Sequence, residues 1–261
     1  MKTLKSAIRA ALPSPLLSAY REYVLSRSSR RNARLSTEEV FTDIYANNRW
    51  GDEPGGGEFC SGAGSRHAAI VSPYVNRVKA ELDRLGASSM KIVDLGCGDF
   101  AVGRQLAAQC GHYLGIDIVK SLIAYNTKMF ATSKISFRHA NIVEDELPEG
   151  DICFVRQVLQ HLSNAEVLAV LPKLLKYRWC FVTEHQPSPD RLVHPNMDKP
   201  HGGDIRVTRG SGIFLEQPPF GVVAENYRLL LEVPGAGMEP GMDPGVIRTF
   251  LLENHANSLS G

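Results

Sequence analysis

The sequence predicts an α/β fold, in which a seven-stranded, mostly parallel sheet ends in an antiparallel hairpin and follows an N-terminal helical arm and a lid. Two observations support this prediction. From about residue 90, short apolar runs alternate with helical stretches, as in a parallel sheet built from β-α-β units. Two later apolar runs, 227–233 and 246–252, are joined by a loop rich in Pro and Gly, which favours a hairpin with a long loop.

The expected elements follow one another along the chain. Strands are predicted at 91–95, 113–117, 135–138, 152–156 and 180–183. Helices are predicted at 102–109, 121–129 and 165–176, and Pro172 is expected to kink the last of these or to end it early. The segment 185–221 is rich in Pro, Gly, His and Asp and has no clear periodicity. Because it is too long for an ordinary connection, we expect it to be a functional substrate loop.

Composition is that of one soluble globular domain with a sizeable core. The chain has 261 residues, of which 22% are charged and 43% hydrophobic, and its formal net charge is +1. A net charge near zero argues against nucleic acid as a partner, because no excess of basic residues is available to neutralise phosphates. We divide the chain into a basic helical arm (1–40), a lid with a leading helix (41–85) and a catalytic core (86–261).

The charge is concentrated at the N-terminus. Residues 1–35 contain eight Lys or Arg and one acid, Glu22, so this stretch carries +7 and the remaining chain sums to −6. Apolar residues recur at helical spacing before and after Pro13 and Pro15, first as Leu4, Ile8 and Leu12 and then as Leu16, Tyr20 and Val24. The arm is therefore interpreted as a helix that packs on the domain or as a basic surface that contacts a membrane or an acidic partner.

Cysteine usage and the N-terminal pattern indicate a cytoplasmic protein. The five cysteines lie far apart and form no C-x-x-C pair, so neither a disulfide framework nor a zinc ribbon is expected. The basic start is not followed by the apolar run of an export signal, because Pro13 and Pro15 interrupt it. The sequence does not indicate an oligomeric state.

The most informative string runs from Ile92 to Phe100, where an apolar strand enters a turn with Gly96 and Gly98 and then a helix. Glycine allows the backbone to approach a ligand closely at such a turn. The next strand ends in Asp117, about twenty residues later, where a carboxylate can accept hydrogen bonds from both hydroxyls of a ribose. This order of elements predicts a site for a nucleoside-containing cofactor.

A dinucleotide site is the competing interpretation. Gly96, Gly98 and Ala101 could imitate its Gly-x-Gly-x-x-Gly pattern, but Asp94 and Asp99 place negative charge where a pyrophosphate would bind. Acidic residues suit S-adenosylmethionine, which carries an amino group, a ribose and a sulfonium but no phosphate. A nicotinamide-dependent oxidoreductase and a non-catalytic cofactor-binding partner stay open as alternatives.

Residues 90–185, with the final hairpin, resemble the class I S-adenosylmethionine-dependent methyltransferases, which have a Rossmann-like fold. Asp94 and the glycine turn match the first motif of this family, and Asp117 matches its ribose-binding acid. At the adenine-side position, Asn141 replaces the usual Asp. The resemblance implies S-adenosylmethionine as the cofactor and the following residues as its contacts: Asp94, Gly96, Cys97, Gly98, Asp117, Ile118, Asn141, Ile142 and Gln157. Trp50, ahead of this core, is predicted to contact the cofactor or the substrate, with packing of the arm on the domain as the alternative.

Two segments outside this core are predicted to form the site for the methyl acceptor. Residues 41–65 resemble a pattern found ahead of the core in some bacterial methyltransferases of small molecules and surface carbohydrates, and their aromatic and Gly residues suit a lid. Glu184 and His185 end the fifth strand, at the edge of the sheet where ligands bind, and His161 lies on a neighbouring loop. Each histidine is a candidate general base, and Glu184 is a candidate to orient His185 or to bind an ammonium group.

The expected reaction is the in-line transfer of a methyl group to a small polar acceptor, with oxygen favoured over nitrogen, such as a sugar or a metabolite of surface glycans. Arg206 and Arg209 could clamp an anionic acceptor. This chemistry requires no metal, and the spacing of Glu184, His185, His201 and Asp204 matches no compact metal-binding motif, so no metal site is predicted.

Overall fold

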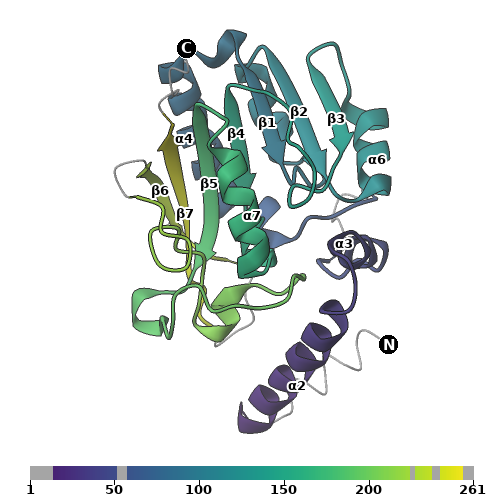
Figure 1. The fold of residues 1–261 in the computed structure, drawn as a ribbon, viewed down its shortest axis with the longest axis vertical. Coiled ribbons are helices and arrows are strands. Elements are labelled where there is room, and N and C mark those ends of the chain that lie inside the picture. The colour runs from purple at the N-terminus through teal and green to yellow at the C-terminus, as the bar shows by residue number, and fades with distance from the viewer. Residues whose placement is uncertain (1–13, 52–57, 224–226, 237–241, 255–261) are drawn as a thin grey trace.

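A computed structural model describes residues 14–51, 58–223, 227–236 and 242–254 (Figure 1). Seven strands form one sheet in the order β3-β2-β1-β4-β5-β7-β6, and only β7 pairs in antiparallel fashion, with both β5 and β6. The strands are β1 Lys91–Leu95, β2 His112–Asp117, β3 Ile135–His139, β4 Ile152–Arg156, β5 Trp179–Gln186, β6 Tyr227–Pro234 and β7 Val246–Glu253. The predicted fold class is confirmed.

Six α-helices are described, and three of them precede the first strand. They are α2 Ser14–Asn32, α3 Thr37–Ala46, α4 Ala68–Leu85, α5 Gly103–Leu106, α6 Lys120–Phe130 and α7 Asn164–Leu174. Where a helix was predicted at 102–109, α5 gives way after one turn to a 3-10 helix at Ala107–Gln109. Pro172 lies inside α7, which ends two residues later.

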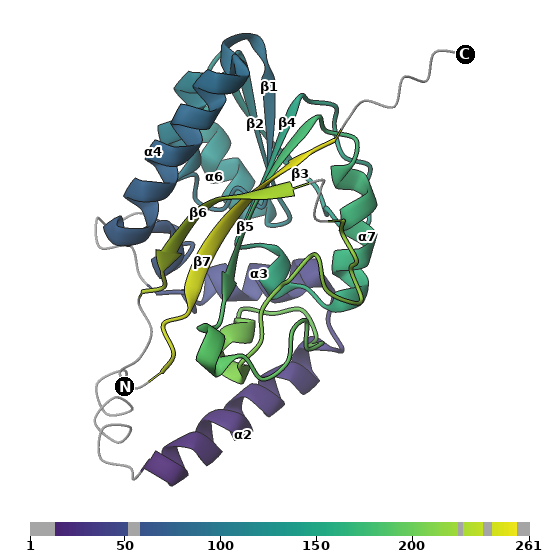
Figure 2. The same cartoon turned by 90° about the vertical axis from the view of Figure 1, so that its left-hand side faces the viewer.

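The alternation of side chains along each strand separates two apolar layers. In β4, Ile152 and Phe154 belong to the buried cluster that includes α4, whereas Cys153 and Val155 belong to the cluster that includes α7. The helices α4 and α7 therefore lie on opposite faces of the sheet (Figure 2). Because the two faces are covered, β1, β4 and β5 are almost entirely buried.

The helix α2 projects from the body on the side where α3 lies (Figures 1 and 2). Pro15 stands in its first turn, where the missing amide hydrogen costs nothing. The predicted apolar residues Leu16, Tyr20 and Val24 are on this helix and are exposed, while Leu4, Ile8 and Leu12 lie outside the described residues. Within the described part of the chain, no helix is both long and apolar enough to cross a bilayer.

Candidate active site

The glycine turn after β1 needs glycine because of its own backbone and neighbours. Gly96 and Gly98 have φ angles of +75° and +53°, in the left-handed region that L side chains rarely adopt. A Cβ at Gly96 would lie 2.5 Å from Val158 Cγ2, and a Cβ at Gly98 would lie 2.4 Å from Ser61 Oγ. Side chains of the protein itself therefore require glycine at these two positions. The sequence pattern had attributed this requirement to a bound ligand.

A cavity opens at the carboxyl ends of β1, β2 and β4, beside this turn. It is the position at which open α/β sheets bind ligands. The cavity brings together all ten residues predicted to contact the cofactor, and His161 also lines it. The predicted residues on its wall are Trp50, Asp94, Gly96, Cys97, Gly98, Asp117, Ile118, Asn141, Ile142, Gln157 and His161.

Two buried carboxylates, Asp94 and Asp117, face this cavity. Asp117 accepts hydrogen bonds from the backbone amides of Gly98 and Val119, each at 3.1 Å. Asp94 accepts a hydrogen bond of 2.7 Å from the Tyr113 hydroxyl. Burial raises the pKa of each carboxyl to about 6, so both are largely ionised at neutral pH and can attract hydroxyl or cationic groups.

Asp99, the third acid of the turn, has an internal role that sequence reasoning missed. Its Oδ2 accepts hydrogen bonds of 2.8 Å from the Ser61 amide and from Arg66 Nη2. The Ser61 hydroxyl in turn accepts a hydrogen bond of 2.9 Å from the Asp99 amide and lies 2.8 Å from the Tyr45 hydroxyl. Asp99 therefore connects α3 and the segment around Ser61 to the glycine turn. Its negative charge is paired with Arg66 within the protein.

An aromatic group closes the cavity on the side of α3. The Trp50 ring lies 5.2 Å from Tyr45, 6.0 Å from Phe41 and 5.3 Å from His161, measured between ring centroids. Its indole Nε1 donates a hydrogen bond of 3.3 Å to the Gly203 carbonyl. Trp50 therefore contacts both α3 and the loop after β5.

His161 is the candidate base whose ring lines the cavity. Its Nδ1 lies 3.0 Å from the Gly202 carbonyl oxygen, and the Gly202 amide donates to the His161 carbonyl at 2.8 Å. Since a carbonyl can only accept, Nδ1 carries the hydrogen and Nε2 carries the lone pair. Burial and the nearby Lys199 ammonium lower the pKa of His161 to about 4, which keeps the ring neutral at physiological pH.

Glu184 does not line the cavity but holds the loop that carries His161. Its two oxygens accept hydrogen bonds of 3.0 Å from the backbone amides of Leu159 and Gln160. The carboxyl is 2% exposed, and burial raises its pKa to about 8. This arrangement fits a residue that positions His161, which differs from both roles predicted for Glu184 from the sequence.

His185 lies on the other side of the strand, because successive side chains of a strand point in opposite directions. Its Nε2 is 2.7 Å from the Pro244 carbonyl oxygen, in the loop between β6 and β7. It is 5% exposed and is not among the residues on the cavity wall. Glu184 and His185 therefore share the predicted edge of the sheet but do not act on one another as a base and its orienting acid.

The loop after β5 is held in place by buried charged side chains. Arg206 is 1% exposed and donates hydrogen bonds to the Leu162 carbonyl and to Asn164 Oδ1. Arg209 reaches α2, where its Nη2 lies 3.4 Å from Ser29 Oγ. The two arginines that were predicted to bind an anionic acceptor thus make contacts within the protein, and neither of them lines the cavity.

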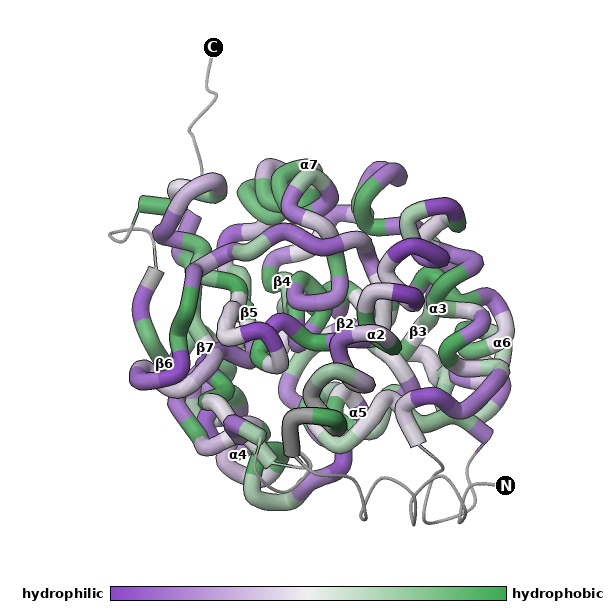
Figure 3. Tube along the Cα trace, turned by 90° about the horizontal axis from the view of Figure 1, so that it is seen from below, coloured by the Kyte–Doolittle hydropathy of each residue, from purple (hydrophilic) through white to green (hydrophobic). Residues whose placement is uncertain are grey.

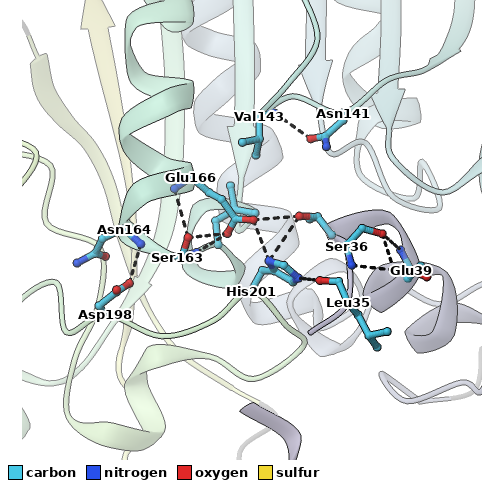
Figure 4. A network of polar contacts seen from close by, with 12 residues as sticks. Leu35, Ser36, Glu39, Asn141, Val143, Ser163, Asn164, Glu166, Asp198 and His201 are labelled. Atoms are coloured by element: carbon cyan, nitrogen blue, oxygen red, sulfur yellow. Dashed lines mark hydrogen bonds and ion pairs between the residues drawn. The ribbon is translucent and has the colours of Figure 1, made fainter. Parts of the chain in front are cut away.

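A second network attaches α3 to the body of the protein (Figure 4). His201 Nδ1 lies 2.8 Å from Glu166 Oε1, and His201 Nε2 lies 3.0 Å from the Leu35 carbonyl oxygen. The Thr37 hydroxyl donates to the same Glu166 oxygen at 2.9 Å. Glu166 also completes a capping box with Ser163 at the start of α7. His201 thus joins three segments that are distant in sequence.

These contacts separate the candidate metal-binding residues from one another. Glu184 binds backbone amides, His185 faces Pro244, and His201 pairs with Glu166. Within the part of the chain that the structure describes, no group of three or more His, Cys, Asp or Glu side chains could hold a metal ion.

A comparison with family models finds one match, in which residues 92–177 correspond to a family described as "Methyltransferase domain". These residues form an S-adenosylmethionine-dependent methyltransferase domain. The match spans the strand, the glycine turn, Asp117 and the His161 loop, which together form most of the cavity. The methyltransferase interpretation therefore prevails over the nicotinamide-dependent one. A comparison with curated proteins finds no match.

Solved structures of methyltransferases share the fold of this methyltransferase. Human N-acetylserotonin methyltransferase, in complex with SAM, is 16% identical and gives a TM-score of 0.51, with 88% of this chain and 65% of that chain covered. Magnesium protoporphyrin IX methyltransferase from Synechocystis PCC 6803, with bound SAM, is 15% identical and gives a TM-score of 0.50, with 84% and 98% covered. At these identities the likeness concerns the fold.

The cavity of the methyltransferase fits S-adenosylmethionine. Its acidic lining from Asp94 and Asp117 suits a ribose and a cationic amino acid group, and it would repel a pyrophosphate. Asn141 Oδ1 accepts a hydrogen bond of 2.9 Å from the Val143 amide, as Figure 4 shows, which leaves the amide Nδ2 to face a ligand. These observations fit the cofactor that the family uses.

Proposed function

We propose that this methyltransferase transfers the methyl group of S-adenosylmethionine to a hydroxyl oxygen of a small polar acceptor, of the kind found in sugars and surface glycans. The observation that supports this proposal is the geometry of His161. A neutral imidazole with a fixed tautomer stands on the cavity wall beside Trp50, and its Nε2, which lies 3.4 Å from Gln160 Nε2, carries the lone pair that would accept a proton.

The choice of a hydroxyl oxygen as the acceptor atom is argued from the presence of a base in the cavity. A hydroxyl must lose its proton as the oxygen attacks, so a neutral imidazole within reach of it assists the reaction. A neutral amine attacks with its own lone pair and can release its proton to solvent afterwards. A fixed, uncharged base in the cavity therefore suits a hydroxyl acceptor.

Residues at one end of the cavity bind the cofactor, and residues at the other end bind the acceptor and take its proton. Asp117 and Asn141 hold the nucleoside of the cofactor, and Asp94 together with the glycine turn holds its amino acid part. When bound, the cofactor supplies a methyl carbon already activated by the adjoining sulfonium. Trp50, Phe41 and Tyr45 exclude water from the opposite end, and His161 receives the proton of the acceptor hydroxyl.

The test is to identify the methylated atom. Purified protein is incubated with methyl-labelled S-adenosylmethionine and a panel of sugars, glycosides and amino sugars, and the products are analysed by mass spectrometry and by the carbon chemical shift of the new methyl group. The proposal expects a methoxy carbon. An N-methyl product from an amino sugar, with no O-methyl product from the matching hydroxyl compound, would refute oxygen as the acceptor while leaving the methyltransferase assignment intact.

A further inference from the structure

One side of α2 carries exposed apolar residues followed by exposed arginines. This surface, called the α2 face below, consists of Leu16, Tyr20, Tyr23, Val24, Arg27 and Arg30. Successive residues of an α-helix are separated by about 100°, which places these six residues within about a third of the circumference. The α2 face is therefore a continuous stripe along one side of the helix.

The apolar members of the α2 face are unusually exposed for their type. Tyr23 is 62% exposed and Leu16 is 58% exposed, whereas most large apolar side chains of the sheet domain are buried. The helix projects beyond the body, and in the view from its end it shows both hydrophobic and hydrophilic colours (Figures 1 and 3). Exposure of several apolar residues on one side of a helix marks an interaction surface.

The charge around this surface is strongly positive. The single acidic residue of α2, Glu22, lies outside the α2 face, about 120° from Leu16 around the helix axis. Residues 1–35 carry +7 in total, and the rest of the chain sums to −6. Attraction to a negatively charged surface is therefore confined to this arm, and the body of the protein opposes it.

We propose that the α2 face binds anionic membrane surfaces, with Leu16 and Tyr23 inserted at the level of the lipid headgroups and Arg27 and Arg30 on anionic lipids. On the α2 face the apolar residues lie toward the N-terminal end and the arginines toward the C-terminal end, so burial of the former and attraction of the latter to anionic lipid would act together. Pairing two copies through the α2 face would bring like charges together, which disfavours self-association. The proposal does not depend on the identity of the methyl acceptor.

The end of α2 leads directly to the candidate active site. Ser28, Arg31 and Asn32 line a second cavity together with Trp50, whose ring also borders the cofactor cavity. Arg31 is excluded from the α2 face because it pairs with Asp43 at 2.9 Å. The α2 face thus belongs to the helix that borders Trp50, and none of its residues lines the cofactor cavity.

The experiment measures co-sedimentation of the full chain with vesicles of phosphatidylcholine alone or mixed with phosphatidylglycerol. Two double variants test the two components: Leu16→Glu with Tyr23→Glu, and Arg27→Glu with Arg30→Glu. Matched controls are Leu168→Glu, at an exposed apolar residue of α7, and Lys128→Glu with Lys134→Glu, which reverses two exposed charges elsewhere. Circular dichroism and binding of S-adenosylhomocysteine confirm that each variant is folded.

The proposal expects preferential binding to the anionic vesicles, a loss of at least tenfold in both test variants, and little change in the controls. Binding should weaken as salt is raised from about 0.1 M to about 1 M, because the Debye length falls from about 10 Å to about 3 Å. Equal binding to both vesicle types would overturn the proposal. So would test variants that bind as the wild type does, or a molar mass by light scattering that only the test variants reduce, which would make the α2 face an interface between copies.

Discussion

The imidazole Nδ1 of His161 lies 3.0 Å from the carbonyl oxygen of Gly202, a residue forty-one positions further along the chain. This contact fixes which ring nitrogen carries the hydrogen, and it does so through the loop after β5. The same loop supplies the Gly203 carbonyl that Trp50 binds. The loop after β5 therefore positions both His161 and Trp50. Changes in that loop should affect the acceptor end of the site.

Asp117→Ala is expected to weaken binding of S-adenosylhomocysteine by roughly 1–3 kcal/mol, because the ribose loses a buried hydrogen-bond acceptor. Isothermal titration calorimetry measures the change directly. The substitution also leaves the Gly98 and Val119 amides without their partner, so thermal unfolding is measured in parallel. Asp83→Ala, at an exposed position on α4, serves as the control. Unchanged affinity in folded Asp117→Ala protein would remove Asp117 from the ribose site.

Glu184→Gln is expected to lower kcat while the KM for the cofactor stays near that of the wild type. The substitution places a side-chain NH₂ group against one of the two backbone amides whose hydrogen bonds Glu184 now accepts, which costs roughly 1–3 kcal/mol and displaces the loop of His161. Asp117 and Asn141 lie outside that loop, so their contacts with the cofactor should persist.

The control for Glu184→Gln is Glu232→Gln, which makes the same substitution at an exposed position of β6. The pH profile distinguishes positioning from a general loss of structure. In Glu184→Gln the acidic limb of kcat should move, because the environment of His161 changes. A uniform loss of activity at every pH, in proportion to unfolding, would argue against a positioning role for Glu184.

The ion pair of His201 and Glu166 is expected to stabilise the protein most at mildly acidic pH. The hydrogen bond to Glu166 raises the pKa of His201, so this contribution is complete below the ordinary histidine pKa of about 6.5 and is lost as pH rises through the higher folded value. Burial alone would raise the pKa of Glu166, but hydrogen bonds from His201 and Ser163 lower it to about 2, so its contribution is lost only near that pH. The window of full effect lies between about pH 4.3 and about pH 6.5.

The measurement for this pair is the Tm of the wild type and of His201→Gln across the pH range. The difference in Tm should be largest at about pH 5–6 and should shrink as the solution becomes alkaline. His194→Gln changes an exposed histidine of the same loop and should show no such window. A difference that grows with rising pH would contradict the assignment of the charged His201 as the stabilising form.

The strands could be predicted from the sequence because each is a short apolar run bounded by turn residues. The exception in length is β5, which continues to Gln186 because Glu184, His185 and Gln186 pair with Arg248, Ile247 and Val246 of β7. The paired residues are about sixty positions apart in the sequence. The local pattern around β5 therefore does not predict this extension. The short α5 likewise depends on packing rather than on the apolar spacing that predicted a longer helix.

The cofactor end of the site could be predicted because its residues follow the strands at fixed places, as Asp117 and Asn141 do. The acceptor end could not, because it depends on contacts between distant segments. Nothing in the local sequence indicates that Asp99 binds Ser61 and Arg66, because both lie more than thirty residues earlier in the chain. The alternation of side chains in β5 does imply that only one of Glu184 and His185 can face a given side.

The most direct test of the central claim compares His161→Ala with His185→Ala in single-turnover methyl transfer to a hydroxyl acceptor. Both histidines were candidate bases in the sequence, but His161 lines the cavity and His185 faces Pro244. We predict that His161→Ala lowers the rate of transfer by about 10²–10⁴-fold, the range for loss of a general base, with S-adenosylhomocysteine affinity retained. His185→Ala should retain nearly the wild-type rate. Normal turnover by His161→Ala, or a comparable loss in His185→Ala alone, would contradict the account.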